Sequence, residues 1–416
     1  MKNLRLLWSL PMIAILTACG GKGSSAPAPT GFTVTPQDTQ LYMTWDAVPG
    51  VEYWVFCDPN QTTISSHATA PTGRLRYTGI FSGTFTATGL TNDTPYMCAV
   101  NGRIDKGAGG ADAVALEPVS PRLAGDTWTN AGATGLPGLR AAAVGTLSGT
   151  TNVRHVVVGQ SGGIKVSSDG ATWSLPTSVP SGLGDLNALV LFGDKFVAAG
   201  AAGQLAYSTD AATWTSASMG SGLTDVQALG SSGSLLVAVG NAGLIRYSSN
   251  GVDWTAASSV PSSANLTGVA YSAAGYWVAV GEGGVVWKST DAQSWTQATA
   301  ASQSLRAVAV LPITVGTTTS YKLVAVGDGG LTGYSTDGVS WTWSSIATSN
   351  LTTVFAGGGQ FMAAGVGGVL YTSTEGQSWS SSKTTGLSEN AASVLRNAAD
   401  NSWHLYGVNG AQAISR

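Results

Sequence analysis

The chain has 416 residues, of which only 10% are charged, and it contains 56 glycines and 14 tryptophans. Its formal net charge of −3 becomes −5 if an N-terminal segment carrying Lys2 and Arg5 is removed, because 17 basic residues then face 22 acidic ones. The composition suits an extracytoplasmic β-protein with many tight turns, since glycine supplies the positive-φ positions that hairpins need. It argues against a helical enzyme and leaves no basic surface for nucleic acid.

The N-terminus, MKNLRLLWSLPMIAILTAC, has a basic start and then an apolar run that is too short to cross a bilayer stably. This pattern predicts a secretory signal peptide over residues 1–18. The ending LTAC resembles the lipobox of bacterial lipoproteins, which implies cleavage before Cys19 and acylation of that cysteine as a membrane anchor. The alternative is an ordinary signal peptide in which Cys19 is incidental. By the same resemblance, Gly20 implies the outer membrane of the bacterial cell envelope and leaves open a periplasmic or an exterior orientation.

Residues 19–29 are rich in Gly, Ser and Pro, and they predict a flexible tether between membrane and folded protein. From residue 30 to residue 121, short alternating strands separated by turns predict one small β-sandwich. Within it, the segment GLTNDTPYMCAV places Leu90, Thr94 and Tyr96 in an arrangement that resembles the tyrosine corner of fibronectin type III domains. This resemblance covers about 90 residues.

The other two cysteines, Cys57 and Cys98, fall on strands that would be neighbours in one sheet of this module. Cys57 has the strand parity of Tyr53, and Cys98 has that of Tyr96, so both side chains point to the same face. In an oxidising compartment this arrangement favours a cross-strand disulfide over two separate buried thiols. Such a bond would stabilise a domain that is too small for a large core.

Residues 125–416 are organised as a repeat with three motifs. The first is SxDGxxW or a variant, such as STDGVSW, and the third is an apolar strand opening with LxAV or a similar sequence. The second is a GxxG turn after an apolar strand, in which Gly281 and Gly284, for example, are expected to take the positive φ of a tight hairpin. Its copies begin at Gly159, Gly200, Gly240, Gly281, Gly327, Gly365 and Gly407, and are spaced by 38 to 46 residues, close to the length of one four-stranded propeller blade.

Seven GxxG turns predict an all-β chain with a seven-bladed β-propeller after the N-terminal sandwich. The SxDGxxW motif occurs only six times, whereas GDTW at Gly125 supplies a seventh tryptophan and the last repeat breaks off at AISR. We therefore expect the N- and C-terminal strands of residues 125–416 to pair and close the ring. The motif is predicted to be a structural staple, because its polar side chains can bond their own turn. Those side chains are Asp169, Asp210, Asn250, Asp291, Asp337 and Glu375.

These motifs resemble the Asp-box (BNR) repeats of sialidases and of the propeller factors that assist photosystem II assembly, over about 290 residues. The expected number of blades agrees with the assembly factors, and this resemblance implies a protein client. Each copy here is one residue shorter between the acidic residue and the tryptophan than the usual box. Sialidases have six blades and need three arginines, a tyrosine and glutamate pair and an acidic proton donor, and no such set stands out in this sequence.

One position in the third motif is polar although its neighbours are apolar. It follows the first residue of each innermost strand and is occupied by Arg140, Asn187, Gln227, Thr267, Arg306 and Thr352, with Ala392 or Ser393 in the seventh repeat. Innermost strands line the central channel of a propeller, so these side chains are expected to form a ring near one mouth. One interpretation is an ordinary water-filled channel. The other is a ligand-binding ring in which Arg140 and Arg306 hold a carboxylate.

Glu282 and Asp328 lie on adjacent GxxG turns, where they are either solvated acids at the rim or the paired carboxylates of a glycosidase. His67, His155 and His404 have no second ligand at helical or hairpin spacing, and each Asp box offers one carboxylate. No metal or other cofactor is therefore predicted. The preferred hypothesis is a non-catalytic, membrane-anchored protein that binds a protein client through one propeller face. The alternative is a carbohydrate-binding or carbohydrate-cleaving propeller at the cell surface.

Overall fold

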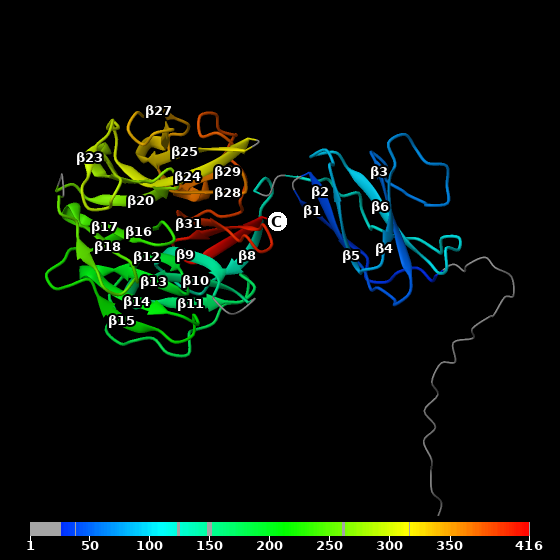
Figure 1. Cartoon of the computed structure of the whole chain (residues 1–416), viewed down its shortest axis with the longest axis horizontal. Helices are drawn as coiled ribbons and strands as arrows, with labels where there is room; N and C mark the ends of the chain where they lie inside the picture. Colours follow the sequence, from blue (N-terminus) through cyan, green and yellow to red (C-terminus); the bar gives the residue numbers. More distant parts are fainter. Residues whose placement is uncertain are drawn as a thin grey trace, which may run out of the picture. The chain divides into compact units, whose positions relative to one another are not determined.

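The computed structural model describes residues 26–37, 39–122, 125–147, 152–259, 263–315 and 317–415. The predicted signal peptide and Cys19 lie outside these residues. The chain divides into two compact units, Met1–Leu123 and Ala124–Arg416. In the described residues the regular elements of both units are β-strands and short 3-10 turns, so the protein is all-β (Figure 1).

Unit 1 contains two antiparallel sheets that share one core. One sheet has the order β1 (Thr33–Gln37), β2 (Gln40–Thr44), β5 (Thr84–Thr88), and the other has the order β4 (Leu75–Ile80), β3 (Glu52–Pro59), β6 (Tyr96–Arg103), β7 (Ala113–Val114). Leu41 and Met43 from the first sheet and Tyr53 and Val100 from the second are buried in one apolar cluster. Strand alternation explains this core, because every second side chain points to the same face.

Local contacts tie β3, β6 and the start of unit 1 together. Cys57 lies opposite Cys98 in the antiparallel register, and a disulfide joins them. The Tyr96 hydroxyl accepts a 3.3 Å hydrogen bond from the backbone N–H of Thr91. Ala26 is buried in the same core. Ala26, which lies inside the segment 19–29 that the sequence predicts as a flexible tether, is thus packed against the core.

Unit 2 forms seven antiparallel sheets in the described residues. The first three are β9 (Leu139–Thr146), β10 (Val153–Gly159), β11 (Ile164–Ser167); β12 (Leu186–Phe192), β13 (Lys195–Gly200), β14 (Gln204–Ser208), β15 (Thr215–Ser218); and β16 (Val226–Ser231), β17 (Leu236–Gly240), β18 (Ile245–Ser248), β19 (Thr255–Ala256). The next two are β20 (Leu266–Ser272), β21 (Tyr276–Gly281), β22 (Val286–Ser289), β23 (Thr296–Gln297); and β24 (Leu305–Val315), β25 (Thr318–Gly327), β26 (Leu331–Ser335), β27 (Thr342–Ser345). The last two are β28 (Leu351–Gly357), β29 (Gln360–Gly365), β30 (Leu370–Ser373); and β31 (Ala391–Arg396), β32 (Trp403–Gly407), β33 (Ala411–Ser415), with β8 (Thr129–Ala133) beside β33.

The sheets of unit 2 close into a ring. Their innermost strands, β9, β12, β16, β20, β24, β28 and β31, contact one another in succession, and β31 also contacts β9 (Figure 1). Between neighbouring sheets lie apolar clusters, such as the one in which Val197 and Leu205 pack against Val226 and Leu236. The space between sheets is thus filled with side chains, and these clusters form the core of the unit.

The GxxG motifs form 3-10 turns between the second and third strands of the first six sheets. These turns are η1 (Gln160–Gly162), η2 (Ala201–Gly203), η3 (Asn241–Gly243), η4 (Glu282–Gly284), η5 (Asp328–Gly330) and η6 (Val366–Gly368). Gly284 has the expected positive φ of 76°, but Gly281 has a φ of −166°, which is extended backbone. Gly281 is needed for another reason, because a Cβ there would lie 2.2 Å from the Asn265 carbonyl oxygen. The first glycine of the motif therefore permits a close backbone approach.

Two sheets have three strands where the repeat predicts four. After β11, the outer segment keeps only a bridge between Val166 and Ser174, and Pro176 follows, which has no N–H to continue the ladder. Beside β30, the Ser380 hydroxyl accepts the backbone N–H of Thr372 at 3.0 Å. A side chain there takes the place of a backbone partner, and this competes with strand formation.

Five of the six Asp boxes share one hydrogen-bond pattern. In the box after β26, the Ser335 hydroxyl donates to the Asp337 carboxylate, which also accepts the backbone N–H groups of Val339 and Ser340 at 2.8 Å each. Asn250 makes the equivalent bonds with its amide oxygen. Glu375 differs, because in the described residues its carboxylate accepts none of these bonds and the Ser373 hydroxyl alone holds the turn. The box thus requires an oxygen at the reach of Asp or Asn.

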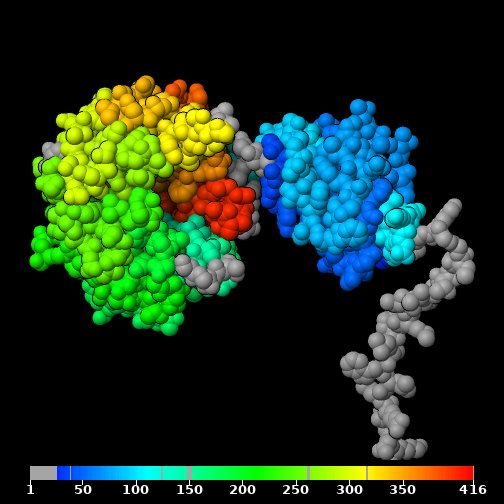
Figure 2. All heavy atoms as spheres, viewed as in Figure 1, coloured from blue at the N-terminus to red at the C-terminus, as the bar shows by residue number. Residues whose placement is uncertain are grey.

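A seventh box is assembled from the two ends of unit 2. The Ser415 hydroxyl accepts the backbone N–H of Gly125 at 2.8 Å, as the Ser167 hydroxyl does from Gly170 in a continuous box. The Trp128 indole N–H donates to the Gly125 carbonyl oxygen at 2.7 Å. Beside this split box, β33 pairs antiparallel with β8, and Figure 2 shows the C-terminal atoms in red against the early residues of unit 2 in teal.

Candidate functional site: the central cavity

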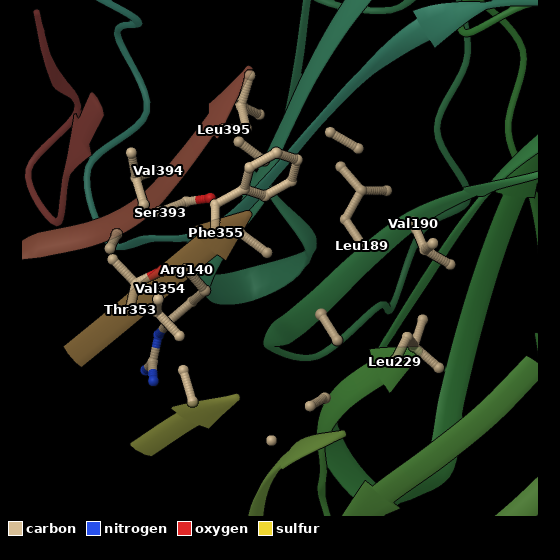
Figure 3. Close-up of a pocket in the computed structure, with 18 of the residues that line it drawn as sticks. Arg140, Leu189, Val190, Leu229, Thr353, Val354, Phe355, Ser393, Val394 and Leu395 are labelled. Carbon is tan, nitrogen blue, oxygen red and sulfur yellow. The ribbon is translucent and has the colours of Figure 1, made fainter. Parts of the chain in front are cut away.

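The innermost strands surround a cavity of about 500 Å³ at the centre of unit 2. Its walls combine aliphatic residues and one phenylalanine with polar residues, and Figure 3 shows Leu189, Val190, Leu229, Val354 and Phe355 around it. The strands run in the same sense around the ring, so their first residues lie together at one end of the cavity. We call this end, which carries Arg140 and Arg306, the cavity mouth.

All six polar residues predicted from the third motif line this cavity: Arg140, Asn187, Gln227, Thr267, Arg306 and Thr352. Ala392 and Ser393, between which the sequence does not decide, both line it as well. All seven innermost strands have a bulge at this position, as between Leu186 and Ala188, which sets the residue apart from the ladder. In the last sheet the bulged residue is Ala392, so Ala392 and not Ser393 is equivalent to the polar residues. The bulge explains why a polar side chain is tolerated in an otherwise apolar strand.

Three of these side chains bind the backbone of the following sheet. The Asn187 amide donates to the Val226 carbonyl oxygen at 2.9 Å, and the Thr267 hydroxyl donates to the Leu305 carbonyl oxygen at 2.8 Å. The Thr352 hydroxyl donates in the same way to the Ala391 carbonyl oxygen at 2.7 Å. These residues are therefore structural links between neighbouring innermost strands, and their hydrogen-bonding capacity is largely used within the ring.

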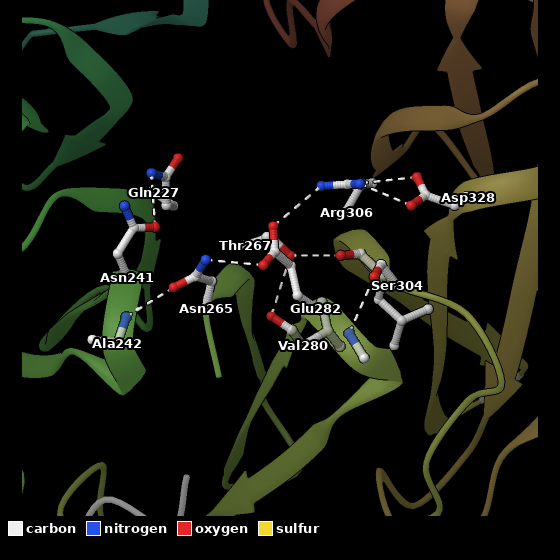
Figure 4. A network of polar contacts seen from close by, with 12 residues as sticks. Gln227, Asn241, Ala242, Asn265, Thr267, Val280, Glu282, Ser304, Arg306 and Asp328 are labelled. Atoms are coloured by element: carbon white, nitrogen blue, oxygen red, sulfur yellow. Dashed lines mark hydrogen bonds and ion pairs between the residues drawn. The ribbon is translucent and has the colours of Figure 1, made fainter. Parts of the chain in front are cut away.

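The two arginines have carboxylate partners already. Arg306 forms a two-pronged pair with Asp328, with bonds of 2.9 and 2.8 Å, and its third nitrogen lies 3.8 Å from the Glu282 carboxylate (Figure 4). The hydrogen bond with Asp328 raises the pKa of Arg306, although partial burial opposes this. Arg140 contacts Asp185 at 3.3 Å. The Nε–Nη2 edge of Arg306 is thus occupied by Asp328, so an external carboxylate at this edge would have to displace Asp328, and the predicted ligand-binding role of Arg140 and Arg306 stays a prediction.

A second repeated contact at the cavity mouth was not anticipated from the sequence. The residue before each innermost strand except β9 caps the 3-10 turn of the preceding sheet, as when Asp185 accepts the backbone N–H of Ser161 at 2.9 Å. The other acceptors of this kind are Asp225, Asn265, Ser304, Asn350 and Asn390. The available signal was an Asp, Asn or Ser before the first residue of each LxAV motif. Asp and Asn serve equally well in this role.

The structure also joins two histidines that are isolated in the sequence. The rings of His155, on β10, and His404, on β32, lie 4.8 Å apart where the last sheet meets the first, and both are buried. Gln412 accepts the Trp173 indole N–H at 3.0 Å, and its amide nitrogen is 3.3 Å from the His404 ring. Burial lowers the pKa of His155. His67 is far away in sequence, in unit 1, where its ring contacts the Gly109 carbonyl oxygen at 3.1 Å.

The described residues contain no group of three His, Cys, Asp or Glu side chains that could hold a metal ion. None of the helices in the described part of the chain is long and apolar enough to span a membrane.

A closed ring of antiparallel sheets around a central cavity defines a β-propeller. No protein-family model and no curated protein sequence matches this chain. Solved structures do match, among them YCF48 bound to D1 peptide, with a TM-score of 0.54 and 16% identity over 70% of this chain and 94% of that chain. YCF48 from Cyanidioschyzon merolae gives 0.52 and 16% over 70% and 98%, and the WD40 β-propeller domain of Doa1 gives 0.55 and 12% over 70% and 97%. The chain is therefore a β-propeller similar to YCF48 and to WD40 propellers, and this likeness concerns the fold.

Proposed function

We propose that this chain is a non-catalytic binding protein that recognises a protein client at the cavity mouth of a seven-bladed propeller. The observation that carries the proposal is the cavity itself, because its size is typical of binding sites and a ring of polar residues stands at its mouth. A fold neighbour, YCF48, has a structure bound to a D1 peptide, which supports a peptide as the kind of ligand. The sequence identity of 16% is too low to infer that this chain binds the same peptide.

The proposal includes a subcellular location. Unit 1 acts as a fibronectin type III-like spacer, and acylated Cys19 anchors the protein in the outer membrane. Replacement of Cys19 by Ala in cells should move the protein from the membrane fraction to the soluble fraction and abolish incorporation of a labelled fatty acid. An unchanged membrane fraction would refute the anchor. Proteinase treatment of intact cells then distinguishes an exterior from a periplasmic orientation.

The binding function is tested with the full chain, purified in detergent, on an array of 15-residue peptides of mixed composition. Reproducible binding to a subset of peptides, competed by the same peptides in solution, is the expected result. A chain that binds no peptide on such an array, while it melts cooperatively, would overturn the proposal. Crosslinking of the bound peptides should map to residues at the cavity mouth.

The second candidate is carbohydrate cleavage or binding, which Glu282 and Asp328 favour because both carboxylates face Arg306 beside the cavity. Hydrolysis of a sialoside or a polysaccharide by the pure chain would favour this second function over protein binding. The activity should then be lost in Asp328→Asn, since a glycosidase needs both carboxyl groups. We expect no hydrolysis, because the same two carboxylates are engaged by one guanidinium.

A further inference from the structure

The sign of the charge at the cavity mouth follows from the residues around it. Two guanidinium groups, those of Arg140 and Arg306, line the cavity there. Four carboxyl groups stand beside them: Asp185 contacts Arg140, Asp328 and Glu282 contact Arg306, and Asp225 precedes the strand that carries Gln227. The mouth therefore has an excess of two negative charges.

These carboxylates are accessible to a ligand. The side chains of Glu282 and Asp185 are 46% and 42% exposed, and that of Asp328 is 28% exposed. Apart from the Arg140 guanidinium, which is already counted, the bonds that Asp185 and Asp225 accept come from neutral backbone N–H groups of η1 and η2, which leave the negative charge in place. Glu282 accepts a 2.9 Å bond from the Asn265 amide, which is neutral as well (Figure 4). None of these partners compensates the excess charge.

The cavity below the mouth offers apolar surface as well. Leu189, Val190, Val354 and Phe355 line it, together with the polar Thr353 and Ser393 and with Arg396 at the far end of β31 (Figure 3). An apolar side chain that enters this space would be removed from water, which is favourable in proportion to its area. A volume of about 500 Å³ accommodates one or two such side chains.

We propose that the cavity mouth binds a basic peptide segment, in which an apolar side chain enters the cavity and flanking lysine or arginine side chains contact the rim carboxylates. This inference rests on the proposed function and specifies its partner. Charge complementarity favours a basic segment, because the mouth has more carboxylates than guanidinium groups. An acidic segment would be repelled by the four carboxylates, and the two guanidinium groups already have carboxylate partners. Long basic side chains also suit a rim, since their aliphatic stems can lie on apolar surface while the charge stays in water.

Three short synthetic peptides, carrying a fluorescent label, test the composition with the full chain. The first has one leucine flanked by lysines, the second has glutamates in place of the lysines, and the third has serine in place of the leucine. We expect the first to bind at least about tenfold more tightly than the second, with an affinity that falls as salt is added. Equal or tighter binding of the acidic peptide would overturn the inference. Equal binding of the first and third peptides would contradict the apolar part of it.

The site is tested by Asp185→Asn combined with Asp225→Asn. Asn occupies the equivalent capping position at Asn265, Asn350 and Asn390, so the double variant keeps the caps and loses two charges. The matched control is Asp169→Asn combined with Asp210→Asn, which also removes two negative charges. Both residues lie in Asp boxes, and Asn250 shows that such a box accepts an Asn. These boxes follow β11 and β14 at the strand ends opposite to η1 and η2. We expect the mouth variant to weaken the basic peptide about threefold to tenfold and the box variant to leave its affinity unchanged.

The outcomes separate this inference from the proposed function. If basic peptides bind the mouth variant and the box variant equally, the mouth is not their site and the inference is overturned, whereas the binding function stands. If the array yields binders that are acidic or uncharged, the inference is again overturned and the function stands. If no peptide of any composition binds a chain that melts cooperatively, both are overturned.

Discussion

The contacts between consecutive sheets of unit 2 differ from the contact at which the last sheet meets the first. Consecutive sheets are joined covalently, and apolar side chains fill the space between them, as Phe192 and Leu236 do between the second and third sheets. The chain also connects the last sheet to the first, because β8 leads into β9, but within the last sheet β33 does not lead into β8. There a split Asp box and strand pairing replace the chain connection. We call this junction, together with the contact of the last sheet with the first, the seam. The side chains that fill that contact are mixed: Tyr406 and Leu139 are apolar or aromatic, but His155, His404 and Gln412 are polar.

The largest effect is expected from removing the strand that closes the seam. Deletion of residues 411–416 removes β33, which lies between β32 and β8, and with it Ser415 of the split box. The exposed sheet edge and the lost apolar contacts should cost more than about 5 kcal/mol, so that cooperative thermal unfolding of unit 2 is lost. Ser415→Ala is the control, since it removes one hydrogen bond and should cost about 1 kcal/mol. A deletion variant that still melts cooperatively would show that the seam is dispensable.

Replacement of the glycine in one Asp box should lower stability more than replacement of the alanine at the same position of another Asp box. Gly338 has a φ of 70°, and a Cβ there would lie 2.8 Å from a ring carbon of Tyr276. Gly338→Ala should cost about 2 to 4 kcal/mol by combining backbone strain and overpacking. Ala292 has a φ of 61° in its own box but is accommodated in an apolar cluster. Ala292→Gly should change the free energy of unfolding by less than about 1 kcal/mol, because relief of strain offsets the lost contact. Chemical denaturation measures both, and similar values for the two would contradict the expectation.

Carboxylate contacts in the continuous boxes give a smaller effect with a defined pH dependence. Asp337→Ala removes the acceptor for two backbone N–H groups and should cost about 1 kcal/mol at pH 7 without affecting ligand binding. Burial by itself would raise the pKa of Asp337, but the hydrogen bonds from the backbone of Val339 and Ser340 outweigh this effect and lower the pKa. A carboxylate with a lowered pKa stabilises the fold above the pKa of the unfolded chain, and this stability is lost as the pH falls below about 4. The difference between wild type and variant should therefore vanish in acid.

The complementary change is Glu375→Asp, which shortens the side chain of the one box whose carboxylate makes no bond to its turn. This variant should gain about 0.5 to 1 kcal/mol, because the shorter carboxylate can reach the backbone N–H groups of the turn. Thermal melting at pH 7 provides the measurement. A loss of stability would mean that Glu375 has a role at its present length.

The smallest effect concerns pH near neutrality at the seam. In the strand register His155 lies opposite Ser167, the first residue of an Asp box. Phe196 and Phe361 occupy the equivalent positions of two other sheets. Burial lowers the pKa of His155, while Asp400 and Asp169 oppose this, and His404 and Tyr406 are the other titratable groups nearby. A histidine with a lowered pKa stabilises the fold above the unfolded pKa of about 6.5 and loses this contribution as the pH falls. His155→Phe should therefore flatten the stability profile between pH 5 and pH 7.

The control for that experiment is Phe196→His, which places an imidazole at the same position of an apolar contact. It should introduce a new loss of stability below pH 6.5, since a charged ring would be buried without a partner. Identical profiles for the His155→Phe variant and the wild type would show that His155 does not couple protonation to folding.

The periodic parts of unit 2 could be predicted from the sequence because each repeat contains its own evidence. The residues Ser335, Asp337 and Trp341 lie within one turn, and glycine spacing sets the strand order. The polar residues of the cavity were found for the same reason, as departures from a pattern that six repeats share. Their partners could not be found, because Arg306 meets Asp328 and Glu282 through two different sheets. Contacts across the seam, such as His155 with His404, join residues that no local pattern connects.

The split box also orders events in time. A ribosome makes Gly125 long before Ser415, so the bond between them cannot form until all the strands of unit 2 have been synthesised. Until then, the partly made ring has two open sheet edges and an uncovered apolar surface, and a loop of nearly the whole unit must close before either is protected. Chains that stop short of Ser415 should therefore be cleared by proteases, so that only chains with a closed propeller persist.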